Sequence, residues 1–181
     1  ELFVSQRPGI VLFYSCGPTV YNRAHIGNLR AYVFSDTIAR VLGAAGYRVR
    51  RVINITDVGH LVGDGDEGED KMAIGAKREQ TTPEVIADRY TKLFIEDIHE
   101  LAIDTDDIRF PRATDYIQEQ IALVKTLEEK GFAYRTPHGV AFDISQFPSY
   151  GKLGNINVPG QRSGARITRD PEKKNPHDFW L

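Results

Sequence analysis

The chain has 181 residues, of which 41% are hydrophobic and 27% charged, a composition typical of a globular protein with one domain, or one domain and a subdomain. The net charge of -2 lacks the basic excess of many nucleic-acid-binding domains, and no run of about 18 apolar residues predicts a membrane span. A single cysteine excludes an internal disulfide and fits a reducing compartment, so we predict a cytoplasmic protein.

The N-terminal part predicts a strand, a helix and a second strand. An apolar run over residues 10–16 indicates a buried strand, and apolar spacings of three and four predict a helix over 28–42. Residues 47–55 alternate and then become apolar, as expected for another strand. Two strands joined in this way are parallel, and ligands bind at their carboxyl ends, here residues 16–17 and 56–57.

The remaining chain predicts two helices and a hairpin. Thr82 and Pro83 indicate a helix start, and the stripe of that helix is Ile86, Tyr90, Leu93, Phe94 and Leu101. A second helix begins at Thr114, with buried positions Ile117, Ile121, Val124 and Leu127. Residues 132–135 and 140–144 predict a hairpin, and glycine, proline and polar residues predict loops over 145–169.

The sequence His-Ile-Gly-Asn at residues 25–28 stands between the first strand and the first helix. A helix N-terminus attracts phosphate through its backbone N–H groups and its dipole. The His25 imidazole adds a hydrogen-bonding group that can follow charge developing on a phosphate, and Gly27 leaves room for a nucleotide. Asn28 can donate a hydrogen bond but carries no charge. These residues predict a phosphate site.

Several blocks together resemble the N-terminal part of the cysteinyl-tRNA synthetases, a family of class I aminoacyl-tRNA synthetases. They are Cys-Gly-Pro-Thr-Val-Tyr at residues 16–21, the tetrad at 25–28, Asn-Ile-Thr-Asp at 54–57, Asp-Glu-Gly-Glu-Asp-Lys-Met at 66–72 and Lys-Asn-Pro-His-Asp-Phe at 174–179. The resemblance covers nearly the whole chain and keeps the order and spacing of the family.

This resemblance implies an α/β fold. Residues 1–105 are expected to form the first half of a Rossmann-like, parallel-sheet nucleotide-binding domain, and residues 106–181 to begin the connective insertion that splits it. The second half of the fold and the anticodon-reading region would lie in the remainder of the same polypeptide. We therefore interpret the chain as a fragment, with no complete catalysis in isolation.

The resemblance also implies an activity, in which ATP with Mg²⁺ activates L-cysteine and the product charges tRNA(Cys). His25 and Asn28 would be catalytic. ATP would be bound by Gly17, Pro18, Thr19, His25, Gly27 and Asn28, and cysteine by Cys16, Gly17, Thr19, Tyr21 and Thr56.

A zinc ion belongs to the same expectation. Taken alone, Cys16 is most simply a small buried hydrophobic residue. In the family it is one of four zinc ligands, and zinc distinguishes a thiolate from a hydroxyl better than shape does. The other three ligands would follow Leu181, and the spacing around His60 does not support a local zinc site.

Two other functions remain open on the sequence. One is a paralogous ATP-dependent ligase that joins cysteine to an aminosugar, and the other is a non-catalytic half-domain whose terminal Phe179, Trp180 and Leu181 pair with a partner. The acidic residues 64–70 predict a solvated loop. Arg48, Arg50 and Arg51 predict a solvated sheet edge, with contact to the tRNA acceptor end as the alternative.

Overall fold

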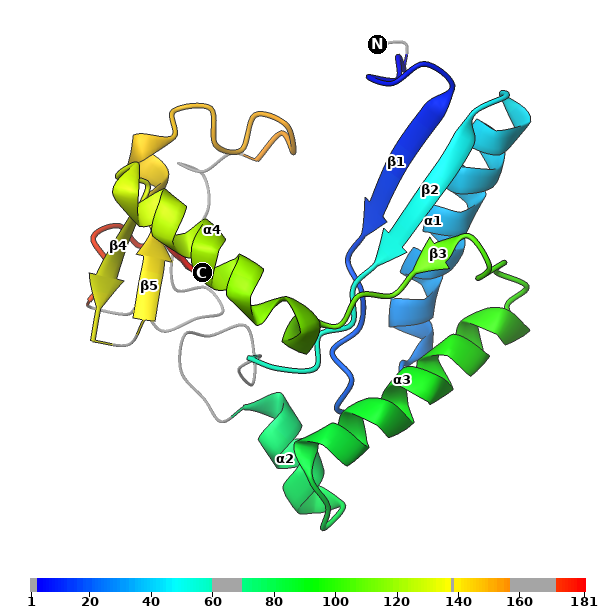
Figure 1. The fold of residues 1–181 in the computed structure, drawn as a ribbon, viewed down its shortest axis with the longest axis horizontal. Coiled ribbons are helices and arrows are strands. Elements are labelled where there is room, and N and C mark those ends of the chain that lie inside the picture. The colour runs from blue at the N-terminus through cyan, green and yellow to red at the C-terminus, as the bar shows by residue number, and fades with distance from the viewer. Residues whose placement is uncertain (1–2, 60–69, 138, 157–171) are drawn as a thin grey trace. The chain divides into compact units, whose positions relative to one another are not determined.

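The structure, a computed structural model, describes residues 3–59, 70–137, 139–156 and 172–181 (Figure 1). Contacts divide the chain into two compact units, one holding residues up to 60 and 70–115, the other holding 61–69 and 116–181. The division after residue 115 falls later than the domain boundary predicted at 105, because residues 108–109 pair with the sheet of the first unit. The assignment of these units to a nucleotide-binding half and an insertion stays a prediction.

The first unit is built on a parallel sheet. Its strands are β1 (Ile10–Ser15), β2 (Arg48–Ile53) and β3 (Ile108–Arg109), in the order β1-β2-β3. β1 pairs with β2 from Ile10 opposite Arg48 to Ser15 opposite Ile53. The connection between them is α1 (Ile26–Ala44), so the predicted parallel strand–helix–strand unit is confirmed.

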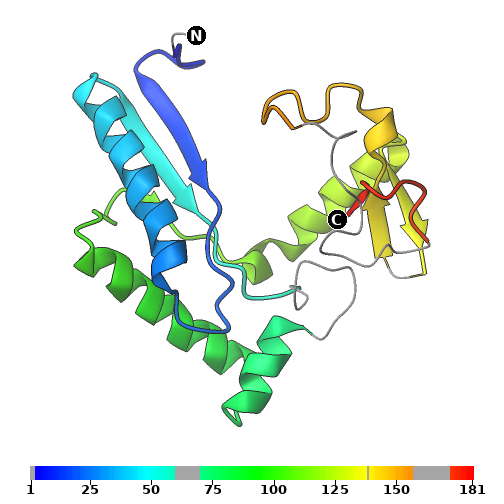
Figure 2. The ribbon, with the colours of Figure 1, turned by 180° about the vertical axis from the view of Figure 1, so that it is seen from behind.

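The core of this unit joins the sheet to α1 and to α3 (Pro83–Glu100). The Tyr32 ring of α1 meets the Phe94 ring of α3 edge to face, with 4.9 Å between centroids. Ile53 of β2 is buried in the same cluster. Figure 2, seen from behind, shows α1 in front of the strands. The apolar stripes of both helices therefore cover one face of the sheet.

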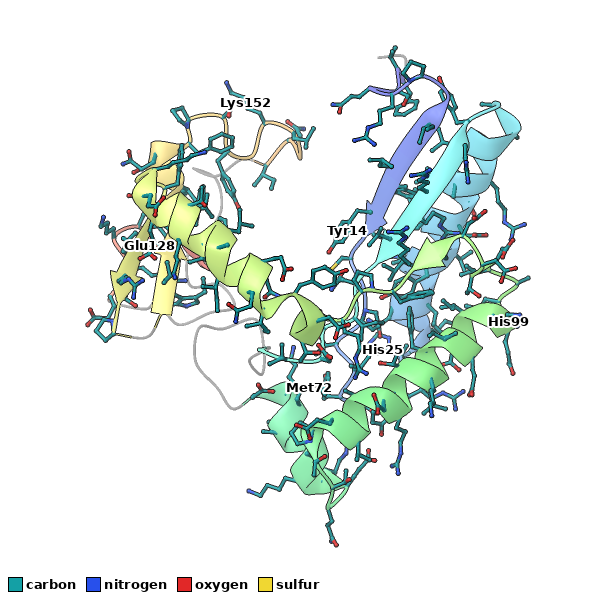
Figure 3. The ribbon with its side chains drawn as sticks, viewed as in Figure 1. Tyr14, His25, Met72, His99, Glu128 and Lys152 are labelled. Carbon is teal, nitrogen blue, oxygen red and sulfur yellow. The ribbon has the colours of Figure 1, made fainter. Side chains whose placement is uncertain are left out.

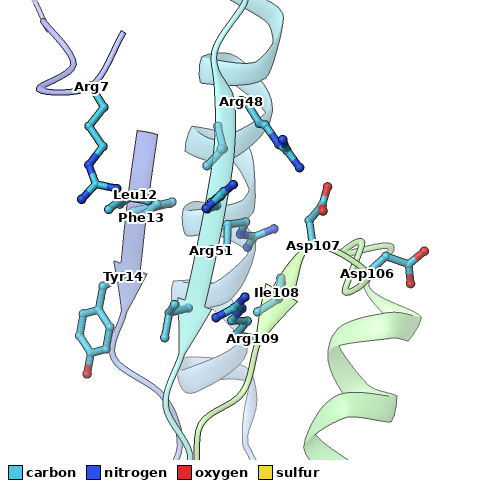
Figure 4. Close-up of a pocket in the computed structure, with 13 residues that line it drawn as sticks. Arg7, Leu12, Phe13, Tyr14, Arg48, Arg51, Asp106, Asp107, Ile108 and Arg109 are labelled. Atoms are coloured by element: carbon cyan, nitrogen blue, oxygen red, sulfur yellow. The ribbon is translucent and has the colours of Figure 1, made fainter. Parts of the chain in front are cut away.

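The opposite face of the sheet is open among the described residues. Leu12 and Tyr14 of β1 are 58% and 62% exposed, so β1 is not the fully buried strand that its apolar sequence predicts. These side chains, together with Arg48 and Arg50 of β2, line a groove of about 640 Å³ (Figure 4). A strand at a sheet edge with one covered face buries only alternate residues, which explains the difference.

The arginine cluster of β2 divides between the two faces. Arg48 and Arg50 are exposed, as predicted, but Arg51 is buried on the α1 side. There its guanidinium lies 2.6 Å from the Asp36 carboxylate, which also pairs with Arg40. The expectation that all three arginines are solvated is wrong for Arg51, because side chains alternate along a strand.

A short helix, α2 (Lys71–Arg78), was not predicted from the sequence. Asp70 begins it by accepting a hydrogen bond from the Met72 N–H at 2.6 Å. Met72, Gly75 and Ala76 are its buried residues. Asp70 is the one described residue of the acidic stretch 64–70, and the predicted loop otherwise lies outside the described residues, as does His60.

The helices predicted to begin at Thr82 and Thr114 agree with the structure to different degrees. α3 begins as predicted, with the Thr82 side chain accepting from the Val85 N–H. After β3, a 3-10 turn (Ala113–Tyr116) comes before α4 (Ile117–Glu129), which therefore begins later than Thr114. None of the described side chains of α4 is buried, so its predicted buried stripe is wrong. No helix among the described residues is long and apolar enough for a membrane crossing.

The second unit contains the predicted hairpin, whose turn residue His138 is outside the described residues. β4 (Ala133–Thr136) and β5 (Gly139–Phe142) pair antiparallel, and β6 (Phe179–Trp180) adds to β5. A further 3-10 turn, Ile144–Gln146, follows β5. Phe179 and Trp180 thus pair with β5 of the same chain, which corrects the expectation that they pair with a partner protein. Of the predicted loops, residues 157–171 lie outside the described residues.

Candidate active site

His25 caps the N-terminus of α1 (Figure 3). Its Nδ1 atom accepts a hydrogen bond from the Gly27 N–H at 3.1 Å, and the backbone N–H of His25 donates to Oδ1 of Asn28 at 3.2 Å. Because a backbone N–H can only donate, Nδ1 carries the lone pair and the ring hydrogen lies on Nε2. The exposed imidazole therefore offers an N–H donor to an acceptor outside the helix.

Gly27 makes this arrangement of the imidazole possible. A Cβ at residue 27 would lie 2.8 Å from Cε1 of His25 and 3.0 Å from Nδ1, closer than side chains normally approach. The Asn28 N–H donates to the His25 carbonyl at 2.9 Å. The N–H groups of residues 27 and 28 are thus engaged inside the cap. What the helix end offers to an anion here is mainly the imidazole and the helix dipole.

A cavity of about 280 Å³ lies beside this helix end. Six of the predicted site residues line it: Gly17, Pro18, Thr19, Tyr21, His25 and Asn28. Cys16, Gly27 and Thr56 are not among its lining residues. Five other lining residues were not predicted from the sequence: Asn22, Arg23, Ala24, Tyr32 and Lys71. The loop after β1 and the start of α1 therefore supply most of the wall.

Lys71 brings a cation to the cavity from the first turn of α2. Its Nζ lies 5.8 Å from the centroid of the Tyr21 ring. Arg23, the other strong cation of the lining, is paired with Asp97 through contacts of 2.5 and 3.2 Å. Lys71 therefore contributes the positive charge of the cavity that is not neutralised by a carboxylate among the described residues. Asp70, the N-cap of α2, is a sequence signal for a helix start at Lys71, but it carries no information about which cavity that helix end reaches.

Cys16 directly follows β1 and has an exposed free thiol. Burial raises the pKa of the Tyr32 hydroxyl to about 12, and the negative charge of a Cys16 thiolate adds to that rise. Tyr32 also lines the cavity beside His25. Because Cys16 directly follows β1 and His25 caps α1, the next element, the thiol and the imidazole lie at the same end of the sheet, as the positions of their motifs predict.

The ends of β1 and β2 meet beside Thr56. The Thr56 N–H donates to the Pro18 carbonyl at 2.9 Å, and the Val20 N–H donates to the Thr56 carbonyl at 3.1 Å. Residues 19 and 56 form a parallel bridge. The motifs at residues 16–21 and 54–57 are thereby held at one rim of the sheet.

Asp57 fixes the same rim to the segment that follows β3. Its buried carboxylate accepts hydrogen bonds from the Thr114 N–H at 3.0 Å and from the Arg112 guanidinium at 2.9 Å. Burial raises the pKa of the Asp57 carboxyl, but the hydrogen bonds from Thr114 and the charge and hydrogen bond of Arg112 outweigh it, so the pKa is lowered. Arg112 also pairs with Asp88 of α3 at 2.6 Å. Asp57 therefore acts as a structural anchor.

No group of three or more histidine, cysteine or acidic residues in the described parts of the chain is arranged to hold a metal ion. Cys16 is the single zinc ligand predicted here, and one thiolate does not make a tetrahedral site. The residues present therefore do not fit zinc by themselves, and no chemical step is derived through it.

Comparison with known proteins identifies the family of this chain. The profile of the family described as "tRNA synthetases class I (C) catalytic domain" matches residues 2–181. The chain belongs to this family. The class I synthetase resemblance predicted from the motifs is thereby confirmed, together with the α/β fold class.

Two curated relatives show what the chain is similar to. A cysteine–tRNA ligase of Treponema denticola is 47% identical over 181 residues, covering 100% of the chain and 37% of the relative. Cysteine–tRNA ligase 1 of Burkholderia lata is 50% identical over 179 residues, covering 99% of the chain and 38% of the relative. The chain thus spans less than two-fifths of the relatives' length.

Solved structures support the class I fold. A leucyl-tRNA synthetase (LeuRS) of Agrobacterium radiobacter K84, in a ternary complex with tRNA and LeuAMS, superposes with a TM-score of 0.53 and 22% identity over 72% of this chain and 16% of its own. A putative arginyl-tRNA synthetase of Campylobacter jejuni gives 0.54 and 16% over 78% of this chain and 39% of its own. At such identities the likeness concerns the fold alone.

Proposed function

We propose that this chain works as part of a cysteine–tRNA ligase. The complete enzyme activates L-cysteine with ATP to give cysteinyl-adenylate and pyrophosphate, and then esterifies the 3′ end of tRNA(Cys). The observation that carries the proposal is the identity of 47–50% with cysteine–tRNA ligases over 99–100% of the chain. A cytoplasmic location is part of the same proposal.

His25 acts on the phosphates in this proposal. Its Nε2–H donates to a phosphate oxygen of ATP, and that hydrogen bond strengthens as charge builds on the transferring phosphate. The Nδ1 contact with Gly27 holds the ring in this orientation at 3.1 Å. Catalysis by such a group is electrostatic stabilisation and positioning, as in other phosphoryl and nucleotidyl transfers.

Lys71 and the loop after β1 complete the binding site in the proposal. Lys71 provides a cation for the polyphosphate, while the backbone of Gly17, Pro18 and Thr19 lines the nucleotide side of the cavity. Cys16 and Thr56 contact the amino acid at the adjoining strand ends. Tyr21 supports Lys71 through its ring at 5.8 Å.

The test is cysteine-dependent exchange of pyrophosphate into ATP, followed by charging of tRNA(Cys), with the full-length polypeptide. Exchange without charging would favour the aminosugar ligase. Removing His25 as His25→Ala should lower kcat of the exchange by about 10²–10³-fold, as expected for the loss of one transition-state donor. The matched control is His99→Ala, an exposed histidine in the last turn of α3 (Figure 3). Equal exchange rates for His25→Ala and the unchanged enzyme would refute the role of His25.

A further inference from the structure

The side chain of Asn54 links the ends of the two central strands. Its Oδ1 accepts hydrogen bonds from the Gly17 N–H at 2.9 Å and from the Tyr14 hydroxyl at 2.7 Å. Its Nδ2 donates to Oγ1 of Thr56 at 3.0 Å. Because the Gly17 N–H can only donate, the amide oxygen must face Gly17 and the amide nitrogen must face Thr56.

This orientation determines the direction of the Thr56 hydroxyl. A hydroxyl oxygen that accepts from Asn54 Nδ2 directs its own hydrogen elsewhere. Among the described residues, the Thr56 hydroxyl donates to no protein group. The Thr56 backbone is held on both sides by Pro18 and Val20, which keeps the hydroxyl in place at the strand end. Thr56 is thus a hydrogen-bond donor ready for an acceptor outside the protein.

We propose that Asn54 is a positioning residue that makes Thr56 a hydrogen-bond donor to an acceptor atom of the amino acid substrate. The proposal rests on the proposed function, in which Thr56 contacts that amino acid. A chain of hydrogen bonds then runs from the Gly17 N–H through Asn54 and Thr56 to the substrate. The same chain ties the turn after Cys16 to the position of the Thr56 hydroxyl.

The chemical consequence is a preference for acceptors at this place. A donor of fixed direction stabilises an oxygen or sulfur atom that carries lone pairs or negative charge, such as a carboxylate or a thiolate. If Asn54 did not set the direction, the Thr56 hydroxyl would be equally able to accept from an ammonium group. Asn54 therefore favours an acceptor at this place, because it occupies one lone pair of the Thr56 hydroxyl and leaves the hydroxyl hydrogen to be donated.

Replacing Asn54 by aspartate reverses the direction without removing the side chain. In Asn54→Asp the carboxylate still accepts from Gly17 and Tyr14, but it can only accept from Thr56 as well, so the hydroxyl hydrogen turns away from the substrate. In the full-length enzyme, the KM for cysteine in pyrophosphate exchange should rise about tenfold, as for one lost hydrogen bond, while the KM for ATP stays within about twofold.

A double-mutant cycle separates this role from a structural one. Thr56→Val should raise the KM for cysteine about tenfold in the unchanged enzyme but by less than about twofold in the Asn54→Asp background, since the donor is already lost there. Tyr14→Phe is the matched control, because it removes another contact to the same amide oxygen and leaves the link to Thr56 intact. We expect an unchanged KM for cysteine in that variant.

Each outcome has a clear meaning. Equal effects of Thr56→Val in both backgrounds, or a parallel rise of the KM for ATP in Asn54→Asp, would overturn the positioning role. If Asn54→Asp does not fold, Asn54→Ser replaces it in the cycle, because its shorter side chain loses the link to Thr56. The same loss of coupling is expected. Absence of cysteine-dependent exchange in the unchanged enzyme would instead overturn the proposed function itself.

Discussion

Replacing Gly17 by alanine should strongly disturb the rim of the sheet, where the ends of β1 and β2 meet. A Cβ at residue 17 would lie 1.5 Å from the backbone carbonyl oxygen of Asn54. No side-chain rotation can relieve this clash, because the Cβ is bonded directly to the backbone and the oxygen belongs to it. Carbon and oxygen in contact are about 3.3 Å apart, so Gly17→Ala must separate the strand ends by roughly 1.8 Å. The hydrogen bond from the Gly17 N–H to Asn54, now 2.9 Å, would then be broken.

The cost follows from those two effects. Overpacking of this kind costs about 1–3 kcal/mol, and the lost hydrogen bond about 0.5–1.5 kcal/mol, so the unfolding free energy should fall by about 1.5–4.5 kcal/mol. For a domain of this size the melting temperature should fall by on the order of 10 °C. The KM for cysteine should rise as well, because the link from Gly17 through Asn54 to Thr56 is interrupted.

Thermal unfolding of the full-length polypeptide, followed by fluorescence, measures the first effect, and pyrophosphate exchange measures the second. Gly43→Ala is the matched control, since a Cβ at residue 43 of α1 would meet nothing within 4 Å. Alanine favours a helix, so this variant should melt at the same temperature or slightly higher. A Gly17→Ala protein that melts within about 2 °C of the unchanged one and exchanges normally would show the reasoning to be wrong.

Asp57→Asn should lower the melting temperature at pH 7, and this difference should disappear in acid. The pKa of the Asp57 carboxyl is lowered in the folded protein, so the ionised carboxylate stabilises the fold above its unfolded pKa of about 3.9. That stability is lost as the pH falls through the lower, folded pKa. Melting curves of both proteins from pH 7 down to about pH 3 test this, and a constant difference at every pH would contradict it. Lys71→Gln should raise the KM for ATP about tenfold and leave the KM for cysteine unchanged, as for one lost charge-assisted contact, with exposed Lys92→Gln as control. Equal KM values for ATP in Lys71→Gln and the unchanged enzyme would remove Lys71 from the phosphate site.

Local chemistry allowed much of this fold to be predicted. The apolar run over residues 10–16, the helical spacing after His25 and the second apolar run predict a parallel strand–helix–strand unit, which the pairing of β1 with β2 confirms. Thr82 and Pro83 mark the start of α3, where side-chain capping is a property of neighbouring residues. The motif positions likewise predict that Cys16 and Thr56 come to one rim.

The sequence by itself therefore determined the family, the order of the N-terminal elements and the rim to which the motif residues belong, because helix caps, periodicity and motif spacing act over a few residues. The tertiary structure alone decided which face of each element is covered: Arg51 is buried against Asp36, whereas Leu12 is exposed and α4 buries none of its described side chains. It also decided that Lys71 reaches the cavity beside His25. Burial and long-range contact depend on what packs against a segment from elsewhere in the chain, and that information is not contained in the segment's own residues.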